Sequence, residues 1–382
     1  MTTALVMAGG RSQRMRATRG PEHKALVPVL GVPLLERNLC ALLSAGFSDL
    51  AVVVGADEPE LEAYVSSRGV LLARARGATL QCLREAAPLG TLGAAGLLRD
   101  RPGPVLVVNV DNLTAIDLAA LVAHHLAERA EMTVATHHEA FRIPFGELHV
   151  RDGVVTGYRE KPALPVRISS GTYVVSREVC AAIEPGRRTD TPALCMRLVE
   201  RGARVAAYEH ARPWIDVNDA ESLVRAEELV RAHPEAFEQW SGAPDAARVR
   251  VAFTDGDGIW VRDGAGEDGV LPSLLLDGAA DASGAARRIP PPAGWTGPAP
   301  VRLASFDVLE TESGRVVRHH LFVSDGRAEL DGYAAAEGWR RAAAGEEARL
   351  APEGPDARAL AWLRAWRPRS GAPAAVPLAA SA

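Results

Sequence analysis

The chain has 382 residues, of which 47% are apolar and 24% charged, a composition typical of folded globular proteins that excludes a mainly disordered chain. At about 150 residues per domain the length predicts two domains, and no apolar run approaches the roughly 18 residues of a transmembrane helix. The formal net charge of −5 argues against a basic nucleic-acid-binding protein, so we expect neither nucleic acid nor a membrane as a partner.

The first part of the chain, residues 1–240, alternates strand and helix patterns. Apolar runs predict strands at 3–8, 50–55, 70–75, 104–111 and 132–136. Helical spacing predicts helices between them at 33–46, 58–67, 93–100 and 117–130. Continuous apolar strands separated by helices indicate an α/β fold with a mixed, mainly parallel sheet. Such a sheet places its ligands at the carboxyl ends of the strands.

The pattern changes near residue 140. Short β segments at 145–150, 154–159 and 171–175 predict a β-rich substrate region inserted on the α/β core. A helix at 192–201, a strand at 205–209 and a long helix at 219–232 complete the predicted domain.

A second domain follows a segment with the composition of a linker, 241–247 (SGAPDAA). We therefore predict domains at 1–240 and 247–368, the second a smaller α+β domain, and a disordered tail at 369–382. Strand patterns in the second domain lie at 248–253, 258–262, 270–276, 301–311 and 316–323, and helix patterns at 334–343 and 355–366.

The cysteines and the N-terminus together predict a cytoplasmic protein. Cys40, Cys82, Cys180 and Cys195 are far apart and lack metal-binding spacing, so we expect reduced thiols. Residues 1–6 carry no basic segment ahead of an apolar run, so we expect no signal peptide.

The first candidate motif is a glycine turn, Ala8-Gly9-Gly10, directly after the first predicted strand. Glycines there let backbone N–H groups approach an anion. Basic residues crowd the following segment: Arg11, Arg14, Arg16, Arg19 and Lys24. That density suits a polyphosphate, although a solvated basic loop explains the glycines equally well.

The second motif, Gly90-Thr91-Leu92-Gly93, begins a predicted helix with small residues. Thr91 has the character of an N-cap, and the small side chains would let a base or sugar lie against the backbone. Close packing of the helix accounts for these residues at least as well.

Two acids stand in apolar surroundings. Asp111 ends a buried predicted strand, and Asp216 follows Trp214-Ile215. Each is either a helix cap or a metal ligand, and together two carboxylates would bind one Mg²⁺ that holds nucleotide phosphates. A further motif, Glu160-Lys161-Pro162, offers a lysine for a phosphate monoester, or a surface ion pair of little energetic weight.

The order of these motifs resembles the sugar nucleotidyltransferases, also called NDP-sugar pyrophosphorylases, over residues 3–230. That family includes glucose-1-phosphate thymidylyl- and adenylyltransferases and mannose-1-phosphate guanylyltransferases. The resemblance implies catalytic roles for Arg14, Lys24 and Asp111, and Mg²⁺ ligation by Asp111 and Asp216. It implies nucleotide binding by Ala8, Gly9, Gly10, Ser12, Gln13, Gly90 and Thr91. It implies substrate binding by Gly146, Glu160, Lys161 and Gly171. Ser12 departs from the family, which has a third glycine at that position.

The implied reaction transfers a nucleoside monophosphate from an NTP to a sugar-1-phosphate or a similar cyclitol phosphate. It releases pyrophosphate and forms an NDP-sugar. The segment 111–160 is more similar to the guanylyltransferases, which favours GTP and a mannose- or glucose-like 1-phosphate. The alternatives are a cytidylyltransferase for a non-sugar phosphate and an inactive regulatory subunit that binds nucleotide-sugars. We expect a homodimer, and an enzyme of secondary metabolism.

The second domain resembles the Nudix fold in its strand pattern alone. The stretch where a Nudix box belongs, 277–289 (DGAADASGAARRI), contains no Glu and so lacks the carboxylates that bind catalytic metals. The resemblance implies a non-hydrolytic domain that serves dimerisation or closes over the acceptor. An unrelated small α+β domain explains the pattern equally well.

Overall fold

The computed structural model describes residues 2–10, 23–240, 244–255, 258–262, 271–276, 281–292, 294–328, 339–342 and 354–366. The chain forms two compact units. The first contains Met1–Ala25 and Asn38–Ser222, and the second contains Leu26–Arg37 and Leu223–Ala382. The predicted domain boundary near residue 240 stays a prediction, as does the tail at 369–382, which lies outside the described residues.

The first unit is built on a seven-stranded sheet of order β12-β8-β11-β6-β1-β4-β5. Its strands are β1 (Thr3–Met7), β4 (Asp49–Gly55), β5 (Thr79–Glu85), β6 (Val105–Asn109), β8 (Met132–Arg142), β11 (Ala163–Val175) and β12 (Val205–Glu209). The neighbours β1–β4, β1–β6, β4–β5 and β8–β12 are parallel, and β11 is antiparallel to both of its neighbours. The predicted α/β fold with a mixed, mainly parallel sheet is confirmed.

Helices and apolar strands enclose the core of this unit. The helices are α2 (Leu34–Ser44), which continues from the second unit, α3 (Pro59–Tyr64), α4 (Val70–Ala75), α5 (Leu118–Ala127), α6 (Arg177–Ala182) and α7 (Thr191–Glu200). One buried cluster joins Leu5 and Val107 of the sheet to Ile183 and Leu198 of the segments that pack on it. The central strands β1, β4 and β6 are apolar at most positions, the pattern of strands that are covered on both faces.

The predicted strand at 70–75 is wrong. Residues 59–75 are helical throughout, as α3, the π-helical turn η2 (Val65–Gly69) and α4, and the chain turns at Gly77, whose φ is +66°. A short apolar run cannot be distinguished by its periodicity from a buried helical segment. The strand of this region is β5, which follows the turn, and its mixed sequence TLQCLRE contains no clear apolar run. The predicted helix at 93–100 is the 3-10 helix η3 (Gly93–Leu98).

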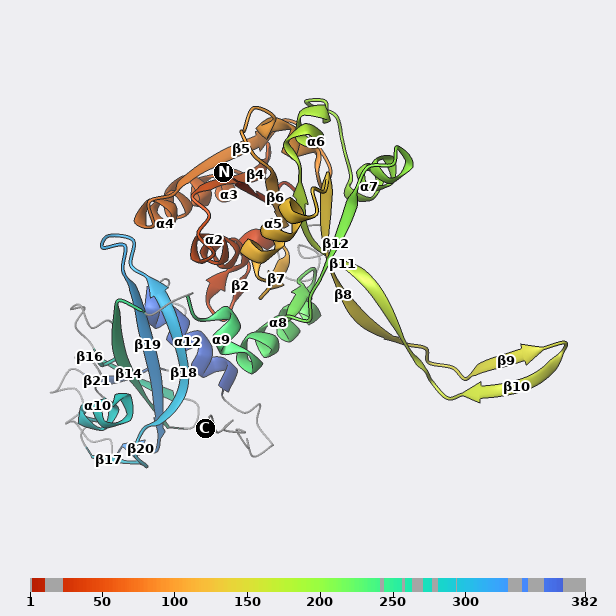
Figure 1. The fold of residues 1–382 in the computed structure, drawn as a ribbon. Coiled ribbons are helices and arrows are strands. Elements are labelled where there is room, and N and C mark those ends of the chain that lie inside the picture. The colour runs from red at the N-terminus through yellow and green to blue at the C-terminus, as the bar shows by residue number, and fades with distance from the viewer. Residues whose placement is uncertain are drawn as a thin grey trace. The chain divides into compact units, whose positions relative to one another are not determined.

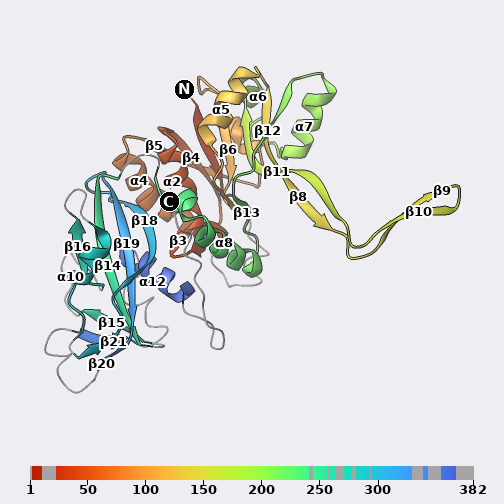
Figure 2. The ribbon, with the colours of Figure 1, turned by 60° about the horizontal axis from the view of Figure 1, so that its bottom comes forward.

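Two strands of the sheet continue beyond it as an extended arm. We call residues 137–168 the arm: the outer halves of β8 and β11, and the hairpin of β9 (Glu147–Arg151) and β10 (Val154–Arg159). The hairpin turns at Asp152 and Gly153, which both have positive φ. Both ribbon views show the arm projecting away from the seven-stranded sheet (Figures 1 and 2). The predicted β-rich region therefore forms, but as a projecting ribbon.

The second unit contains a six-stranded sheet of order β18-β19-β14-β15-β21, with β16 also paired to β14. Its strands are β14 (Ala246–Asp255), β15 (Gly258–Arg262), β16 (Ser273–Leu276), β18 (Val301–Leu309), β19 (Val316–Asp325) and β21 (Trp339–Ala342), and the small ribbon of β17 (Trp295–Thr296) and β20 (Arg327–Ala328) lies apart. The helices are α8 (Ala220–Ala232), α9 (Pro234–Phe237), α10 (Ala282–Arg288) and α12 (Gly354–Trp366). The predicted final helix is thus confirmed.

The predicted helix at 334–343 is wrong where the structure describes it. Trp339–Ala342 forms β21, antiparallel to β15, and residues 334–338 lie outside the described residues. Trp339 is buried and meets Phe253 edge-on at 5.7 Å between ring centroids, so core packing overrides the helical propensity of the Ala- and Arg-rich sequence. The Nudix resemblance stays a prediction.

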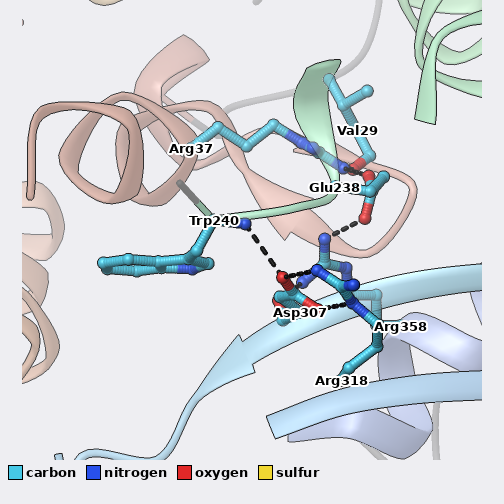
Figure 3. Close-up of polar contacts among 7 residues, drawn as sticks. All are labelled: Val29, Arg37, Glu238, Trp240, Asp307, Arg318 and Arg358. Carbon is cyan, nitrogen blue, oxygen red and sulfur yellow. Dashed lines mark hydrogen bonds and ion pairs between the residues drawn. The ribbon is translucent and has the colours of Figure 1, made fainter. Parts of the chain in front are cut away.

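A buried polar network ties the short hairpin of β2 (Pro28–Val29) and β3 (Val32–Pro33) into the second unit (Figure 3). Arg37 Nη2 donates to Glu238 Oε1 at 2.9 Å and to the Val29 carbonyl at 2.7 Å. Arg358 donates to the other Glu238 oxygen and, at 2.6 Å, to the Asp307 carbonyl. The Glu238 side chain has no exposed surface, so two guanidinium groups balance one buried carboxylate.

Candidate active site

The site forms at the carboxyl ends of β1 and β6, which are parallel neighbours with Met7 opposite Asn109. Ala8 and Gly9 leave β1 at this edge, and Asp111 leaves β6 there. Backbone bonds hold the two exits in place: Val110 N donates to the Met7 carbonyl at 3.1 Å. The glycine turn and the strand-end acid are therefore adjacent, as the parallel-sheet prediction required.

Lys24 and Asp111 form an ion pair in which Lys24 Nζ donates to Asp111 Oδ2. Both side chains are mostly buried, with 18% and 13% of their surfaces exposed. The pair joins the end of β6 to the 3-10 turn at Lys24–Leu26. A lysine and a carboxylate so placed can neutralise charge on a phosphate and hold a cation.

His23 fixes the glycine turn against this pair. Its Nδ1 accepts a hydrogen bond from Ala25 N at 3.1 Å, so the proton of the neutral ring sits on Nε2. Nε2 then donates to the Gly10 carbonyl at 3.0 Å. The His23 side chain is buried, and its two backbone hydrogen bonds position the glycine turn. The sequence pattern around His23 did not predict this role.

Asp216 reaches the same edge from a distant part of the chain. The short strands β7 (Asn112–Thr114) and β13 (Trp214–Asp216) pair antiparallel with Asp216 opposite Asn112. Val217 N donates to the Asp111 carbonyl at 2.9 Å, and Asn218 Nδ2 donates to Asp216 Oδ2 at 2.5 Å. The structure therefore brings the two predicted metal ligands together.

Neither acid caps a helix. Asp117 is the N-cap of α5 and accepts from Ala120 N at 2.8 Å, while Asp219 accepts from Ser222 N at 2.8 Å at the start of α8. The helices that follow Asp111 and Asp216 are therefore capped by other residues, Asp117 and Asp219.

The two carboxylates suit a divalent cation with oxygen ligands. Mg²⁺ is held in proteins by one or two carboxylates together with substrate phosphates and water. Among the residues that the structure describes, no group of three or more His, Cys, Asp or Glu side chains could hold a metal. Asp111 and Asp216 therefore fit a cation that arrives with a nucleotide better than one caged by protein alone.

Gly171 lies beside the site with a left-handed backbone, φ +67°. A Cβ there would lie 2.3 Å from Asn112 Nδ2, which itself donates to the Ser170 carbonyl at 2.7 Å. Trp214 Nε1 donates to the same carbonyl at 2.8 Å. Only glycine fits this position, at the inner end of the arm.

Gly90 and Thr91 form a turn that packs against the segment before α7. Thr91 is not an N-cap: the cap residue of η3 is Leu92, and Thr91 Oγ1 accepts from Thr191 N at 2.8 Å. A Cβ on Gly90 would lie 2.4 Å from Asp190 Oδ1, and one on Gly93 would lie 3.0 Å from the Arg187 carbonyl. Close packing against the segment 187–190 therefore explains the small residues Gly90 and Gly93.

Glu85 is a site residue that the sequence analysis missed. It ends β5, its side chain is buried, and Oε2 accepts from Leu89 N at 3.4 Å. Oε1 is buried with no hydrogen-bond partner in the described part of the chain, and burial raises the pKa of the carboxyl. A Cβ on Gly9 would lie 2.7 Å from Oε2, so the carboxyl faces the glycine turn. The sequence does contain a signal for Glu85, an acid at the end of a strand, but the mixed sequence of β5 did not predict that strand.

Three predicted substrate-binding residues lie on the arm instead of at this edge. Gly146, Glu160 and Lys161 are exposed, and Glu160 accepts only from Tyr158 Oη at 2.8 Å among the bonds described. Ala163 and Ser170 are seven residues apart on β11, about 23 Å at roughly 3.3 Å per residue. A single copy of the chain does not bring them to Asp111. Ser12, Gln13 and Arg14 lie outside the described residues.

The described residues also contain no helix that is both long and apolar enough to cross a membrane.

Comparison with known proteins matches residues 3–233 to the family described as nucleotidyl transferase. Mannose-1-phosphate guanylyltransferase of Mycobacterium tuberculosis is 29% identical over 241 residues, which cover 60% of this chain and 64% of the relative. Glucose-1-phosphate thymidylyltransferase of Streptomyces griseus is 29% identical over 242 residues, which cover 59% and 65%. The chain thus spans less than two thirds of either relative's length. The crystal structure of HddC from Yersinia pseudotuberculosis aligns at 18–19% identity, over 60% of this chain and 99% of the other, with TM-scores of 0.46–0.47.

Proposed function

This chain belongs to the nucleotidyl transferase family, and from that membership we propose that it transfers a nucleoside monophosphate from an NTP to a sugar-1-phosphate. Pyrophosphate leaves and an NDP-sugar forms. The observation that carries the proposal is the Lys24–Asp111 pair, beside the glycine turn and joined by the strand pairing to Asp216. The curated relatives, a guanylyltransferase and a thymidylyltransferase, support the same reaction class.

The reaction needs alignment and charge neutralisation more than it needs a protein nucleophile. A phosphate oxygen of the sugar-1-phosphate attacks the α-phosphorus, and the bond from that phosphorus to the bridging oxygen of the β-phosphate breaks. The backbone N–H groups of the Gly9–Gly10 turn, with Arg14, bind the β- and γ-phosphates. Lys24 stabilises the negative charge that develops at the α-phosphate.

Magnesium is the cation that we propose for this site. Bound to Asp111 and Asp216, it would supply positive charge at the phosphates and orient the triphosphate. Lys24, which pairs with Asp111, would contact the reacting phosphate. Carboxylate oxygens are the ligands that a hard cation such as Mg²⁺ prefers, and Asp111 and Asp216 supply them here.

Guanine is the base that we propose. Glu85 offers a buried carboxyl oxygen without a protein partner, next to the glycine turn where the nucleotide binds. A buried acceptor of this kind needs a donor from the ligand. The Watson–Crick edge of guanine presents two adjacent N–H donors, which match the two oxygens of one carboxylate. Cytosine, uracil and thymine present one donor group on that edge.

The acceptor that we propose is a mannose- or glucose-like 1-phosphate, and the compartment is the cytoplasm. The cytoplasm supplies NTPs and a reducing environment, which suits four cysteines that are far apart in the sequence. We propose a homodimer, no nucleic-acid or membrane partner, and a place in secondary metabolism.

The test measures pyrophosphate release with Mg²⁺ over all common NTPs and a panel of sugar-1-phosphates and cyclitol phosphates. We expect release that requires both GTP and one acceptor, and an NDP-sugar product seen by mass spectrometry. Release with CTP and a non-sugar phosphate would instead favour the cytidylyltransferase alternative. Binding of GTP without turnover on any acceptor would favour the regulatory subunit and contradict the proposal.

A further inference from the structure

A cluster of polar side chains lies where the arm joins the seven-stranded sheet. Its members come from neighbouring strands: His137 and Glu139 from β8, Ser170 from β11, and His210 directly after β12. Figure 1 shows these three strands together at the point where the arm leaves the sheet. Ser170 and His137 have only 1% and 7% of their surfaces exposed, so their polar atoms need partners within the protein.

Hydrogen bonds join the cluster into one chain with Ser170 at its centre. Ser170 Oγ lies 3.0 Å from His137 Nδ1 and 2.8 Å from His210 Nε2. His137 Nε2 lies 3.1 Å from Glu139 Oε1. An ionised carboxylate only accepts, so His137 donates to Glu139 from Nε2 and, in the neutral ring, accepts at Nδ1. Ser170 then donates its hydroxyl proton to His137 and accepts from His210. With both rings neutral, every bond in the chain therefore has a fixed direction.

The surroundings of His210 keep its ring neutral. Burial lowers the pKa of His210 from its ordinary value, and the nearby His137 lowers it further, against a smaller opposing effect of the Arg212 backbone. The centroids of the two imidazole rings are 5.5 Å apart, so two imidazolium charges would repel each other. His210 is therefore the neutral donor that the chain requires.

Ser170 also touches both segments that carry the carboxylates of the candidate active site. Its carbonyl accepts from Asn112 Nδ2 at 2.7 Å and from Trp214 Nε1 at 2.8 Å. Asn112 directly follows Asp111, and Trp214 lies two residues before Asp216. The strands β7 and β13, to which Asn112 and Trp214 belong, pair with Asn112 opposite Asp216. A movement of the Ser170 carbonyl would therefore displace both segments together.

The backbone at Ser170 lies in a bulge of the sheet. The register of β11 on β8 shifts between Ser169 and Tyr173, and Gly171 within this bulge has a left-handed φ of +67°. A glycine gives the adjacent backbone more freedom than any other residue would, and a bulge interrupts the ladder of sheet hydrogen bonds. The direction of the Ser170 carbonyl therefore depends on side-chain contacts, among them the two imidazoles that hold the Ser170 hydroxyl.

We propose that His137, Ser170 and His210 are positioning residues for the metal site. The two imidazoles fix the Ser170 side chain, and the Ser170 carbonyl fixes the strands β7 and β13, which place Asp111 and Asp216. This role rests on the proposed function, in which these two carboxylates bind Mg²⁺. The three positioning residues contact no substrate, and they act on the geometry of the cation site. Contacts that orient metal ligands are worth about 10–100-fold in metal affinity or activity.

Imidazole tautomers test the chain of hydrogen bonds without any substrate. At about pH 8, above the ordinary pKa of histidine, long-range ¹H–¹⁵N spectra should show the single ring protons of His137 and His210 on Nε2. The ten histidines of the chain are assigned by the loss of one signal in each single His variant. Ser170→Ala should remove the preference of His210 for this tautomer, because the acceptor is gone. A wild type with a proton on Nδ1 of His137 would overturn the chain.

The Mg²⁺ dependence of pyrophosphate release tests the positioning role. Ser170→Ala should raise the half-saturating Mg²⁺ concentration about tenfold and leave the KM for GTP at saturating Mg²⁺ within about twofold of the wild type. A protein that is merely destabilised loses active molecules and hence kcat, but the remaining molecules need the same Mg²⁺ concentration.

Thr133→Val is the matched control for Ser170→Ala. Thr133 also belongs to β8, and its Oγ1 lies 2.9 Å from Nδ1 of the buried His125, so the variant likewise removes a buried hydroxyl from an imidazole. The control should lower the melting temperature in circular dichroism as Ser170→Ala does. Its half-saturating Mg²⁺ concentration should equal that of the wild type.

Two variants at His137 separate its two contacts. His137→Asn places an amide near the position of Nδ1, where it can still meet Ser170, whereas His137→Gln reaches the position of Nε2 and meets Glu139. The half-saturating Mg²⁺ concentration should stay within about threefold of the wild type in the first variant and rise about tenfold in the second. Equal values in these two variants, or an unshifted value in Ser170→Ala, would overturn the positioning role. A wild type inactive on every substrate would refute the proposed function and the positioning role with it, while the spectra would still decide the direction of the chain.

Discussion

Replacing Glu238 with glutamine should destabilise the second unit by about 3 kcal/mol. The substitution keeps the shape of the side chain and removes the buried negative charge of Glu238, which faces Arg37 and Arg358 (Figure 3). Both guanidinium groups are nearly buried, with 6% and 12% of their side chains exposed. Removing one partner of a buried ion pair costs roughly 3–5 kcal/mol because it leaves an uncompensated charge.

The expected value lies at the lower end of that range for a structural reason. Each guanidinium keeps a carbonyl acceptor, Arg37 on Val29 and Arg358 on Asp307. The glutamine oxygen can still accept one hydrogen bond, but its amide group would face the second guanidinium donor to donor.

Urea unfolding followed by tryptophan fluorescence measures this effect. Six of the seven tryptophans belong to the second unit, so the signal reports mainly on it. The control is Glu235→Gln, because the Glu235 side chain is 66% exposed, and it should change the unfolding free energy by less than about 0.5 kcal/mol. If Glu238→Gln lowers the unfolding free energy by less than about 1 kcal/mol, the two buried guanidinium groups do not need the carboxylate to balance their charge, and the reasoning is refuted.

Three further predictions concern the active site and the response to pH. Lys24→Ala and Asp111→Ala should each lower kcat/KM by about 100-fold or more in the pyrophosphate-release assay, since each removes charge stabilisation at the phosphates. Glu85→Gln should raise the KM for GTP about tenfold, measured by initial rates, because a charged acceptor of the base is lost. The wild type should lose stability in urea titrations as the pH falls from about 6.5 toward 3. Burial and the adjacent guanidinium lower the pKa of His319 from 6.5 to about 3, so only the unfolded chain takes up this proton in that range.

Each of these predictions has a control. Asp117→Ala removes the N-cap of α5, so it should cost about 1 kcal/mol of stability and leave kcat/KM unchanged. Equal losses in GTP and UTP use by Glu85→Gln would speak against base recognition. His319→Gln should flatten the acid side of the stability curve, because it removes the ring that accepts from Arg250 Nε. An unaltered curve in that variant would assign the pH response to other groups.

The sequence determined the core sheet and the site elements whose information is local. Strands such as 3–8 and 104–111 are buried on both faces, so their apolar runs were unambiguous. Gly9 and Asp111 follow neighbouring parallel strands, so the pattern of apolar strands was sufficient to expect them at one edge, since parallel strands end together. Where a pattern was short or mixed, as in 70–75 and β5, local periodicity could not decide, and Glu85 was missed with it.

Only the tertiary structure decided which distant groups meet. The pairing of β7 with β13 and the buried contacts of Glu238 with Arg37 and Arg358 depend on segments far apart in the sequence. So does the arm: its strands were visible in the sequence, but β8 and β11 could have ended at the sheet. The alternation of apolar and polar side chains predicts which residues share one face of a β ribbon. It does not predict what packs on that face, because burial depends on the rest of the folded chain and on its partners.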